Sequence, residues 1–193
     1  ALDLSNCPSL NRLIVHNNPI TALDVSSNQD LTVLNCGSCN ISTLDVSNHS
    51  NLRELYCNGM SSLSFLYISG ANSLRDLQVQ QTGLLSLNAS NLPALEELRA
   101  NQNQLISIDV TGSDVLKTLH VASNQLTSLS LTDKPNLDEV FCEDNSIASI
   151  NMSNIPALDF LNCRNNLLTT LDVSNQSVLR LLLCDNNLLT SLN

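Results

Sequence analysis

The chain has 193 residues, of which 42% are hydrophobic and only 3% aromatic, with no Trp. Eight Lys and Arg stand against 18 Asp and Glu, giving a formal net charge of -10. A nucleic-acid surface needs clustered Lys and Arg, so this charge argues against nucleic acid as a partner. No apolar run of about 18 residues is present, so we expect no membrane insertion by this segment.

A 21-residue period runs along the chain. Similar heptapeptides, such as Ile-Ser-Thr-Leu-Asp-Val-Ser, recur at residues 20–26, 41–47, 105–111 and 168–174. A fixed period of this length is the signature of a solenoid, in which each repeat contacts only its neighbours. We therefore predict one solenoid domain over residues 1–193, apparently without natural caps.

Each repeat contains two halves. The A half reads Leu-x-x-Leu-Asp-Val-Ser, and the B half reads Leu-x-x-Leu-x-Cys-x-x-Asn. Apolar residues alternate in both halves, which predicts a short strand in each, with the intervening residue facing outward. We number the coils one to nine by the third apolar residue of the B half: Val15, Cys36, Cys57, Val79, Ala100, Val121, Cys142, Cys163 and Cys184.

One coil is a residue longer than the others. Each step along the B series is 21 residues, except for the step of 22 from Cys57 to Val79. The extra residue lies between Cys57 and Leu63, so we expect a bulge or loop near Asn58 and Gly59. We also expect coils two to four to be the least regular.

Two polar rows recur at the turns. Asn closes most B halves, and its amide can both donate to and accept from the turning backbone of its own coil and the next. Ser or Thr follows every A strand, where a hydroxyl can hydrogen-bond the backbone. Both rows are interpreted as structural. The Asn row consists of Asn18, Asn103, Asn124, Asn145, Asn166 and Asn187.

The segment Leu-Asp-Phe-Leu-Asn-Cys-Arg-Asn-Asn-Leu-Leu at residues 158–168 resembles the leucine-rich repeat. The alternation with Leu-Asp-Val-Ser and the recurring Cys resembles the cysteine-ladder branch of the bacterial internalins. This resemblance implies a β-rich solenoid of about nine coils, with the B strands in a parallel sheet on the concave face. It also implies display outside a bacterial cell for adhesion or host contact. The segment carries no cap, sorting motif or immunoglobulin-like domain, so the resemblance does not extend to anchoring.

Seven cysteines suggest disulfides or a metal site, but their positions argue against both. Five of them share one inward position with Val and Ala, where a free thiol acts as a small apolar side chain. The C-x-x-C at Cys36 and Cys39 arises because one residue falls on the apolar row and the other on the Asn row. Cys7 lies in an A-side loop and is expected to be the most reactive thiol.

No catalytic, cofactor or metal motif stands out. The chain has no Gly-rich phosphate loop, H-E-x-x-H or G-x-S-x-G. His16, His49 and His120 are interpreted as solvated surface, because none has a matching Ser or Cys nucleophile. The row of Asp in the A halves lacks the Gly-rich repeats of calcium-binding rolls and is interpreted as solvated charge. We therefore predict a protein that is not an enzyme.

The outward positions of the two halves differ in variability. On the A side they are Asp or small polar residues in nearly every coil, whereas on the B side they change from coil to coil. A scaffold gains nothing from such diversity, but a recognition surface does. All five aromatic residues, Tyr56, Phe65, Tyr67, Phe141 and Phe160, are expected to face solvent, which is typical of interface anchors.

We predict that the B face binds a protein of a host or of the bacterial surface, as part of a surface or secreted adhesin. A glycan-binding module, a structural stalk and an intracellular effector scaffold are the alternatives. For Phe141, Phe160, Leu181 and Leu183, contact with a C-terminal cap competes with partner binding. The predicted partner-binding residues are Tyr56, Gln78, Glu97, Arg99, His120, Glu139, Phe141, Phe160 and Leu183.

Overall fold

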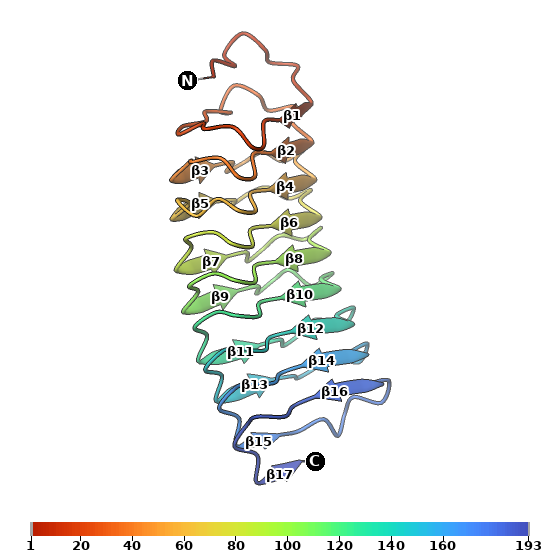
Figure 1. Ribbon diagram of the computed structural model, residues 1–193. Helices are drawn as coiled ribbons and strands as arrows, with labels where there is room; N and C mark the ends of the chain where they lie inside the picture. The colour runs from red at the N-terminus through yellow and green to blue at the C-terminus, as the bar shows by residue number, and fades with distance from the viewer. Residues whose placement is uncertain (1, 193) are drawn as a thin grey trace.

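The computed structural model describes residues 2–192. The chain winds into an elongated parallel β-solenoid whose coils stack from the N-terminal to the C-terminal end (Figure 1). One nine-stranded parallel sheet runs the whole length and is built from the B halves. Its strands are β1 (Arg12–Ile14), β2 (Val33–Asn35), β4 (Glu54–Tyr56), β6 (Asp76–Gln78), β8 (Glu97–Arg99), β10 (Thr118–His120), β12 (Glu139–Phe141), β14 (Phe160–Asn162) and β16 (Leu181–Leu183).

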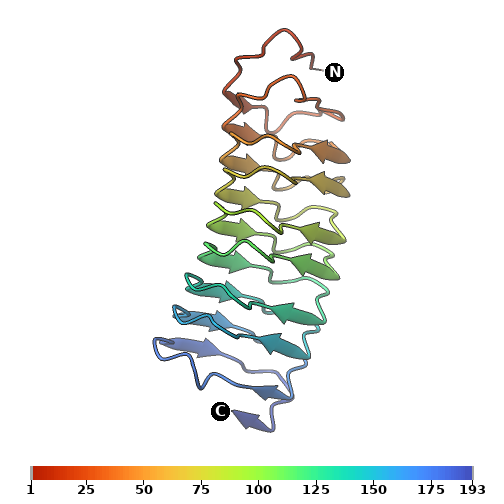
Figure 2. The same ribbon diagram turned by 180° about the vertical axis from the view of Figure 1, so that it is seen from behind.

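The A halves form the opposite side of each coil, as the view from behind also shows (Figure 2). Among the described residues they make four two-stranded parallel sheets instead of one continuous sheet: β3–β5, β7–β9, β11–β13 and β15–β17. Their strands are β3 (Thr43–Asp45), β5 (Phe65–Tyr67), β7 (Ser86–Asn88), β9 (Ser107–Asp109), β11 (Ser128–Ser130), β13 (Ser149–Asn151), β15 (Thr170–Leu171) and β17 (Ser191–Leu192).

The core confirms the predicted register. The middle residue of each B strand stacks on its equivalent in the next coil, as Leu34 does on Leu55 and Leu98 on Leu119. Cys36, Cys57, Cys142 and Cys163 are fully buried within this apolar interior. All seven cysteines are free thiols, and Cys36 Sγ lies 3.8 Å from Cys57 Sγ. The cysteines therefore fill the position of a small apolar residue, as expected, and Cys7 is exposed.

The Asn row acts as predicted in coils five to nine, where it joins neighbouring coils at the turn after the B strand. Asn124 Nδ2 donates to the carbonyl of Ala100 in the preceding coil and to that of Val121 in its own coil, both at 3.0 Å. Its Oδ1 accepts the N–H of Leu105 at 2.9 Å. Cys39, at the equivalent position of coil two, places its Sγ 3.3 Å from the carbonyl of Val15. Coil two therefore keeps part of this bonding without an Asn.

The Asp row of the A halves has a structural role that the sequence interpretation missed. Asp24 Oδ1 accepts the N–H of Ser26 at 2.9 Å, and Asp172 Oδ1 does the same for Ser174 at 2.9 Å. Hydrogen bonding to the side chain and to the backbone N–H of Ser26 and of Ser174 lowers the pKa of the two carboxyls. Asn88 makes the same bond to Ser90 at 3.0 Å. The carboxylate or amide two residues earlier, and not the predicted Ser or Thr hydroxyl, caps the turning backbone.

The extra residue of coil three does not form a bulge at Asn58 and Gly59. Gly59 has a φ of 73°, but Ser38 and Gln81 are also left-handed at the same place in neighbouring coils, with φ of 55° and 57°. The insertion instead adds a second tight turn, in which the N–H of Leu63 donates to the carbonyl of Met60 at 2.8 Å. The B sheet runs without interruption through coils two to four, so the irregularity predicted there is absent from it.

Along the A side, a paired contact between neighbouring strands alternates with an unpaired one. The size of one side chain, in the turn after the second strand of each contact, alternates in the same way. His49, Leu92, Lys134 and Gln176 follow the unpaired contacts, whereas the shorter or Cβ-branched Ala71, Ser113 and Ile155 follow the paired ones. His49 is only 2% exposed, and its Nε2 lies 3.0 Å from the carbonyl of Val25. The interpretation of His49 as solvated is therefore wrong, because its ring bridges two coils on the A side, where no strand pairing joins them.

Candidate functional site

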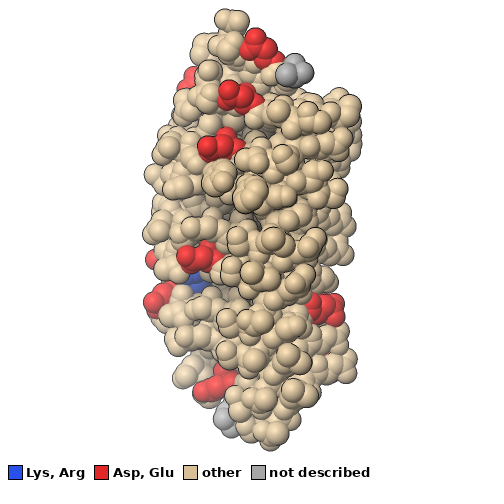
Figure 3. Space-filling view, turned by 90° about the vertical axis from the view of Figure 1, so that its left-hand side faces the viewer, with Lys and Arg blue, Asp and Glu red and all other residues tan. Residues whose placement is uncertain are grey.

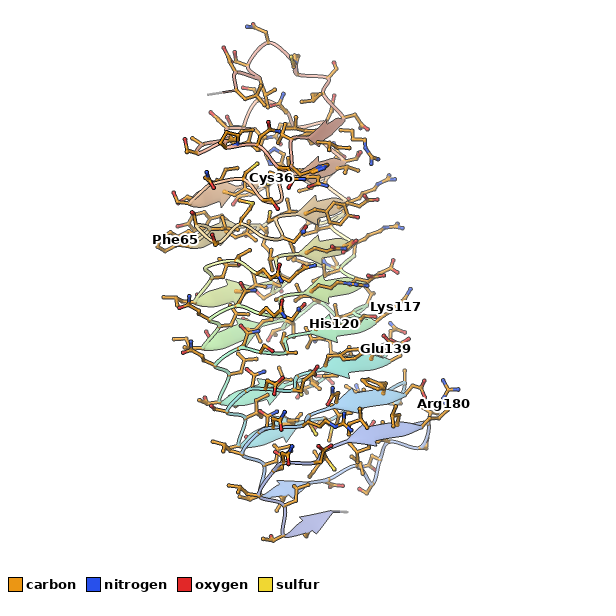
Figure 4. The ribbon with its side chains drawn as sticks, in the orientation of Figure 1. Cys36, Phe65, Lys117, His120, Glu139 and Arg180 are labelled. Carbon is orange, nitrogen blue, oxygen red and sulfur yellow. The ribbon has the colours of Figure 1, made fainter. Side chains whose placement is uncertain are left out.

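The outer face of the B sheet carries two outward rows of side chains. The first row comes from the first residue of each strand and the second from the third residue, so each coil contributes one pair. Figure 4 shows His120 and Glu139 on this side of the rod, with Phe65 on the opposite side. From coil three onward the chemistry of the rows changes from a polar cluster in coils three to five to an aromatic and aliphatic patch in coils six to nine.

The polar cluster is built around three consecutive carboxylates of the first row, Glu54, Asp76 and Glu97. Tyr56 Oη donates to Glu54 Oε2 at 3.1 Å and to Asp76 Oδ2 at 3.0 Å. Gln78 Nε2 donates to Asp76 Oδ2 at 3.1 Å. The phenol and the amide thus hold together carboxylates that would otherwise repel each other.

Burial and charge shift the ionisation of this cluster. Desolvation raises the pKa of Asp76, and its hydrogen bonds from Tyr56 and Gln78 only partly offset that effect. The pKa of Tyr56 is raised well above its ordinary value by burial and by the charge of Asp76. Arg99 pairs with Glu97 at 3.1 Å, and its buried Nε has no hydrogen-bond partner. The cluster is therefore a partly desolvated acidic surface with one guanidinium at its border.

The aromatic patch begins where the polar cluster ends. The ring centroids of His120 and Phe141 are 4.2 Å apart with an interplanar angle of 48°, and those of Phe141 and Phe160 are 4.6 Å apart at 34°. Such tilted contacts add to the stabilisation from burial alone. Leu183 and the 46% exposed Leu181 extend the patch to coil nine. The result is a continuous apolar strip across four coils.

His120 joins the two parts of the surface and is half-buried. Burial lowers its pKa, the nearby charge of Arg99 lowers it further, and Glu97 opposes both. The folded protein therefore favours the neutral ring, whereas the unfolded chain takes up a proton near the ordinary value of 6.5. Because the unfolded state then binds more protons, the contribution of His120 to stability falls as the pH drops through this range.

This linkage predicts a pH-dependent effect of replacing His120. We expect His120→Leu and His120→Gln to lose less stability than the wild type between pH 8 and pH 5, because neither replacement can be protonated. Urea denaturation at both pH values gives the free energies of unfolding to compare. An equal or larger pH-dependent loss in both variants would contradict the expectation.

Ion pairs between coils line the sheet on both sides. Lys117 Nζ lies 2.6 Å from Glu96 Oε2 on the side before the strands, where Arg180 also pairs with Asp159. Arg164 pairs with Asp185 after the strands. These exposed pairs contribute little stability each. They neutralise charge at the margins of the sheet.

The structure corrects the predicted exposure of this face. Phe65 and Tyr67 are 58% and 49% exposed, but both lie on the A side. Tyr56, Phe141 and Phe160 on the B face are only partly exposed, because side chains on strands about 4.8 Å apart cover one another. Val33 and Asn162, at outward positions, are buried at 7% and 8% exposure.

The predicted binding residues fall into two groups. Tyr56, Gln78, Glu97 and Arg99 belong to the polar cluster, and His120, Phe141, Phe160 and Leu183 belong to the patch. Glu139 is exposed between Thr118 and Phe160. The predicted set omits Glu54 and Asp76, which Tyr56 contacts directly. Their shared place in the first outward row was the only signal for them in the sequence.

Other kinds of site have little support on this surface. Over residues 2–192, no group of three or more His, Cys, Asp or Glu is placed to hold a metal ion. The same part of the chain has no helix that could span a bilayer. Burial raises the pKa of the Cys142 and Cys163 thiols, which disfavours the nucleophilic thiolate.

Comparison with solved structures identifies the class of fold. A leucine-rich-repeat protein of Leptospira interrogans matches 95% of this chain at 19% identity with a TM-score of 0.54. An internalin of Listeria monocytogenes matches 95% of it at 22% identity with a TM-score of 0.61. The chain spans 62% and 63% of those two proteins. No protein-family model matches the sequence, and comparison with curated proteins gives no significant match. The chain therefore has the leucine-rich-repeat solenoid fold, with bacterial proteins including an internalin among its structural neighbours.

Proposed function

We propose that this chain is a non-enzymatic protein-binding module whose partner docks on the outer face of the B sheet. The observation that carries the proposal is the joining of the polar cluster to the aromatic patch on one rigid surface. A buried apolar centre beside hydrogen-bonding and charged groups is the usual composition of a protein interface. The A side, with its repeated small polar residues, offers no comparable variety.

We further propose that the module belongs to a surface or secreted adhesin of a bacterium. The resemblance of its repeat to the cysteine-ladder internalins supports this location. The partner would then be a protein of a host or of a bacterial surface. Buried thiols suit an extracellular setting as well as an intracellular one, because they need no disulfide to stabilise the coils. An intracellular effector scaffold is therefore an alternative location for the same binding face.

A glycan on the B face has weaker support than a protein. Phe141 is stacked between the rings of His120 and Phe160, which partly cover its two faces. A sugar needs an open ring face to pack against. A structural stalk would leave the whole face unused, and it gives no reason for the variety of its side chains.

Binding measurements with matched variants test the proposal. The labelled chain is applied to arrays of extracellular host proteins, bacterial surface proteins and glycans, and the Kd of each protein that binds is measured. We expect the combined variant Tyr56→Ala, Arg99→Ala and Phe141→Ala to weaken protein binding at least about tenfold, since anchors at interface centres carry most of the binding energy.

The control is the combined variant Ser107→Ala, Ser128→Ala and Ser149→Ala on the A side. These exposed hydroxyls lie outside the B face, so we expect its Kd to match that of the wild type. Thermal melting of both variants verifies that they fold. Unchanged protein binding by the B-face variant, or binding of glycans alone through its three side chains, would refute the proposal.

A further inference from the structure

Coil three departs from the repeat on the side of the solenoid opposite the proposed protein-binding face. The outward A-strand positions are Ser or Thr followed by Asp, Asn or Ser in most coils, but in coil three they are Phe65 and Tyr67. These are the two most exposed aromatic rings, at 58% and 49%. Figure 4 shows Phe65 projecting from the outer edge of the A side.

Tyr67 replaces a group that has a structural role in other coils. Asp45 and Asn88, the equivalent residues before and after it, cap the N–H two residues onward, at 2.8 and 3.0 Å. A phenol on Tyr67 cannot make this short local bond to Ser69. Coil three thus gives up a stabilising cap and exposes a large apolar ring instead. Stability of the coil gives no reason for this exchange, whereas binding of a ligand to the exposed ring does.

A hollow lies beside Tyr67, where the A strands are not paired. β5 belongs to the β3–β5 sheet and β7 to the β7–β9 sheet, so the two strands face each other without ladder hydrogen bonds. The hollow has a volume of about 290 Å³ and is lined by Tyr67, Gly70, Asn72, Asn88 and Asn91, among others. This volume is at the lower end for small-molecule sites and suits a ligand of one ring.

The polar groups of this hollow are neutral. Asn88 uses its Oδ1 to cap Ser90, which leaves its Nδ2 as a donor. Asn72 is exposed, so its amide can both donate and accept. None of the lining residues is charged, and Figure 3 shows a stretch without charged groups in the upper middle of this face. By contrast, the hollow between β9 and β11 is lined by Asp114, Asp133 and Lys134.

We propose that this hollow binds one pyranose ring of a neutral saccharide. The apolar C–H face of the sugar packs on the ring of Tyr67, and its hydroxyls hydrogen-bond the amides of Asn88 and Asn72. An anionic or cationic sugar would find no counter-charge among the lining residues. Phe65, two residues before Tyr67, extends the aromatic surface toward the next sugar of a chain. The site is separate from the B face and does not depend on its partner.

Two substitutions borrowed from other coils test the site without disturbing the fold. Tyr67→Asp restores the residue found in coils such as those of Asp45 and Asp109, together with its cap. Asn88→Asp keeps the cap on Ser90 but replaces the amide donor with an acceptor. We expect Tm to be unchanged or raised for Tyr67→Asp, so that a loss of binding does not reflect unfolding.

The probes are neutral monosaccharides (glucose, galactose, mannose and N-acetylglucosamine), measured by saturation-transfer NMR, and an array of neutral oligosaccharides. We expect the wild type to bind at least one neutral sugar and Tyr67→Asp to weaken that binding at least about tenfold, with a smaller loss for Asn88→Asp. Phe141→Ala on the B face is expected to bind sugar like the wild type.

The two sets of probes distinguish a free monosaccharide from a sugar ring within an oligosaccharide as the ligand. Binding of free monosaccharides indicates a site complete for one ring, whereas binding only of oligosaccharides indicates that the ring is recognised as part of a chain through Phe65. Absence of binding to every neutral probe, exclusive binding of charged sugars, or equal binding by Tyr67→Asp would overturn the proposal.

Discussion

Replacing Asn166 by Ala is expected to lower the free energy of unfolding by about 3 kcal/mol or more, because several buried backbone groups lose their partners together. Asn166 Nδ2 donates to the carbonyls of Cys142 and Cys163 at 3.0 and 3.2 Å. Its Oδ1 accepts the N–H of Ile147 at 2.9 Å. Asn166 is 5% exposed, so water cannot readily replace these bonds. Urea denaturation followed by circular dichroism measures the loss.

Asn136→Ala provides a control of the same chemistry at an exposed turn. Ala94 and Ala157 occupy the equivalent position in other coils, so we expect a change within about 0.5 kcal/mol. Asn166→Cys is expected to fall between these two, because Cys39 shows that a thiol at this place reaches the same kind of carbonyl. A loss for Asn166→Ala as small as that for Asn136→Ala would mean that the Asn row does not join the coils.

Leu98→Ala is expected to cost about 3 kcal/mol through lost burial and the cavity that remains. Leu98 is fully buried in β8, between Leu77 of β6 and Leu119 of β10. Since each coil of a solenoid contacts only its neighbours, the cavity weakens the contacts on both sides of coil five. Urea denaturation gives the size of the loss, and hydrogen exchange shows whether the amides of β6 and β10 open more readily.

Leu85→Ala tests whether burial is the cause. Leu85 is 56% exposed on the A side, so its removal is expected to change stability by no more than about 0.5 kcal/mol. A loss below about 1 kcal/mol for Leu98→Ala would indicate that the interior relaxes to fill the cavity. If hydrogen exchange instead increases uniformly along the rod, and not first in coils four to six, the result would contradict a solenoid in which each coil contacts only its neighbours.

The side-chain chemistry of the proposed binding surface was only partly predictable. Variation at Tyr56, Arg99 and Phe141 marked the B face, because the repeat itself supplies the comparison between coils. The contact of Tyr56 with Asp76 was not predictable, since it depends on how far a phenol reaches across a neighbouring strand. The stacking of His120 on Phe141 was likewise not predictable, and it leaves both outward-facing rings only partly exposed.

The sequence by itself determined the solenoid, its register and the identity of its inward rows, because a 21-residue period forces equivalent residues such as Leu98 and Leu119 to stack. It also determined that the inward thiols act as small apolar core residues, since Cys and Val alternate at the same position of the B half. Only the tertiary structure decided that the A strands pair in twos, that His49 is buried between coils, and that a hollow opens beside Tyr67. These features depend on how far individual side chains reach across the gap between coils, a distance that periodicity does not encode.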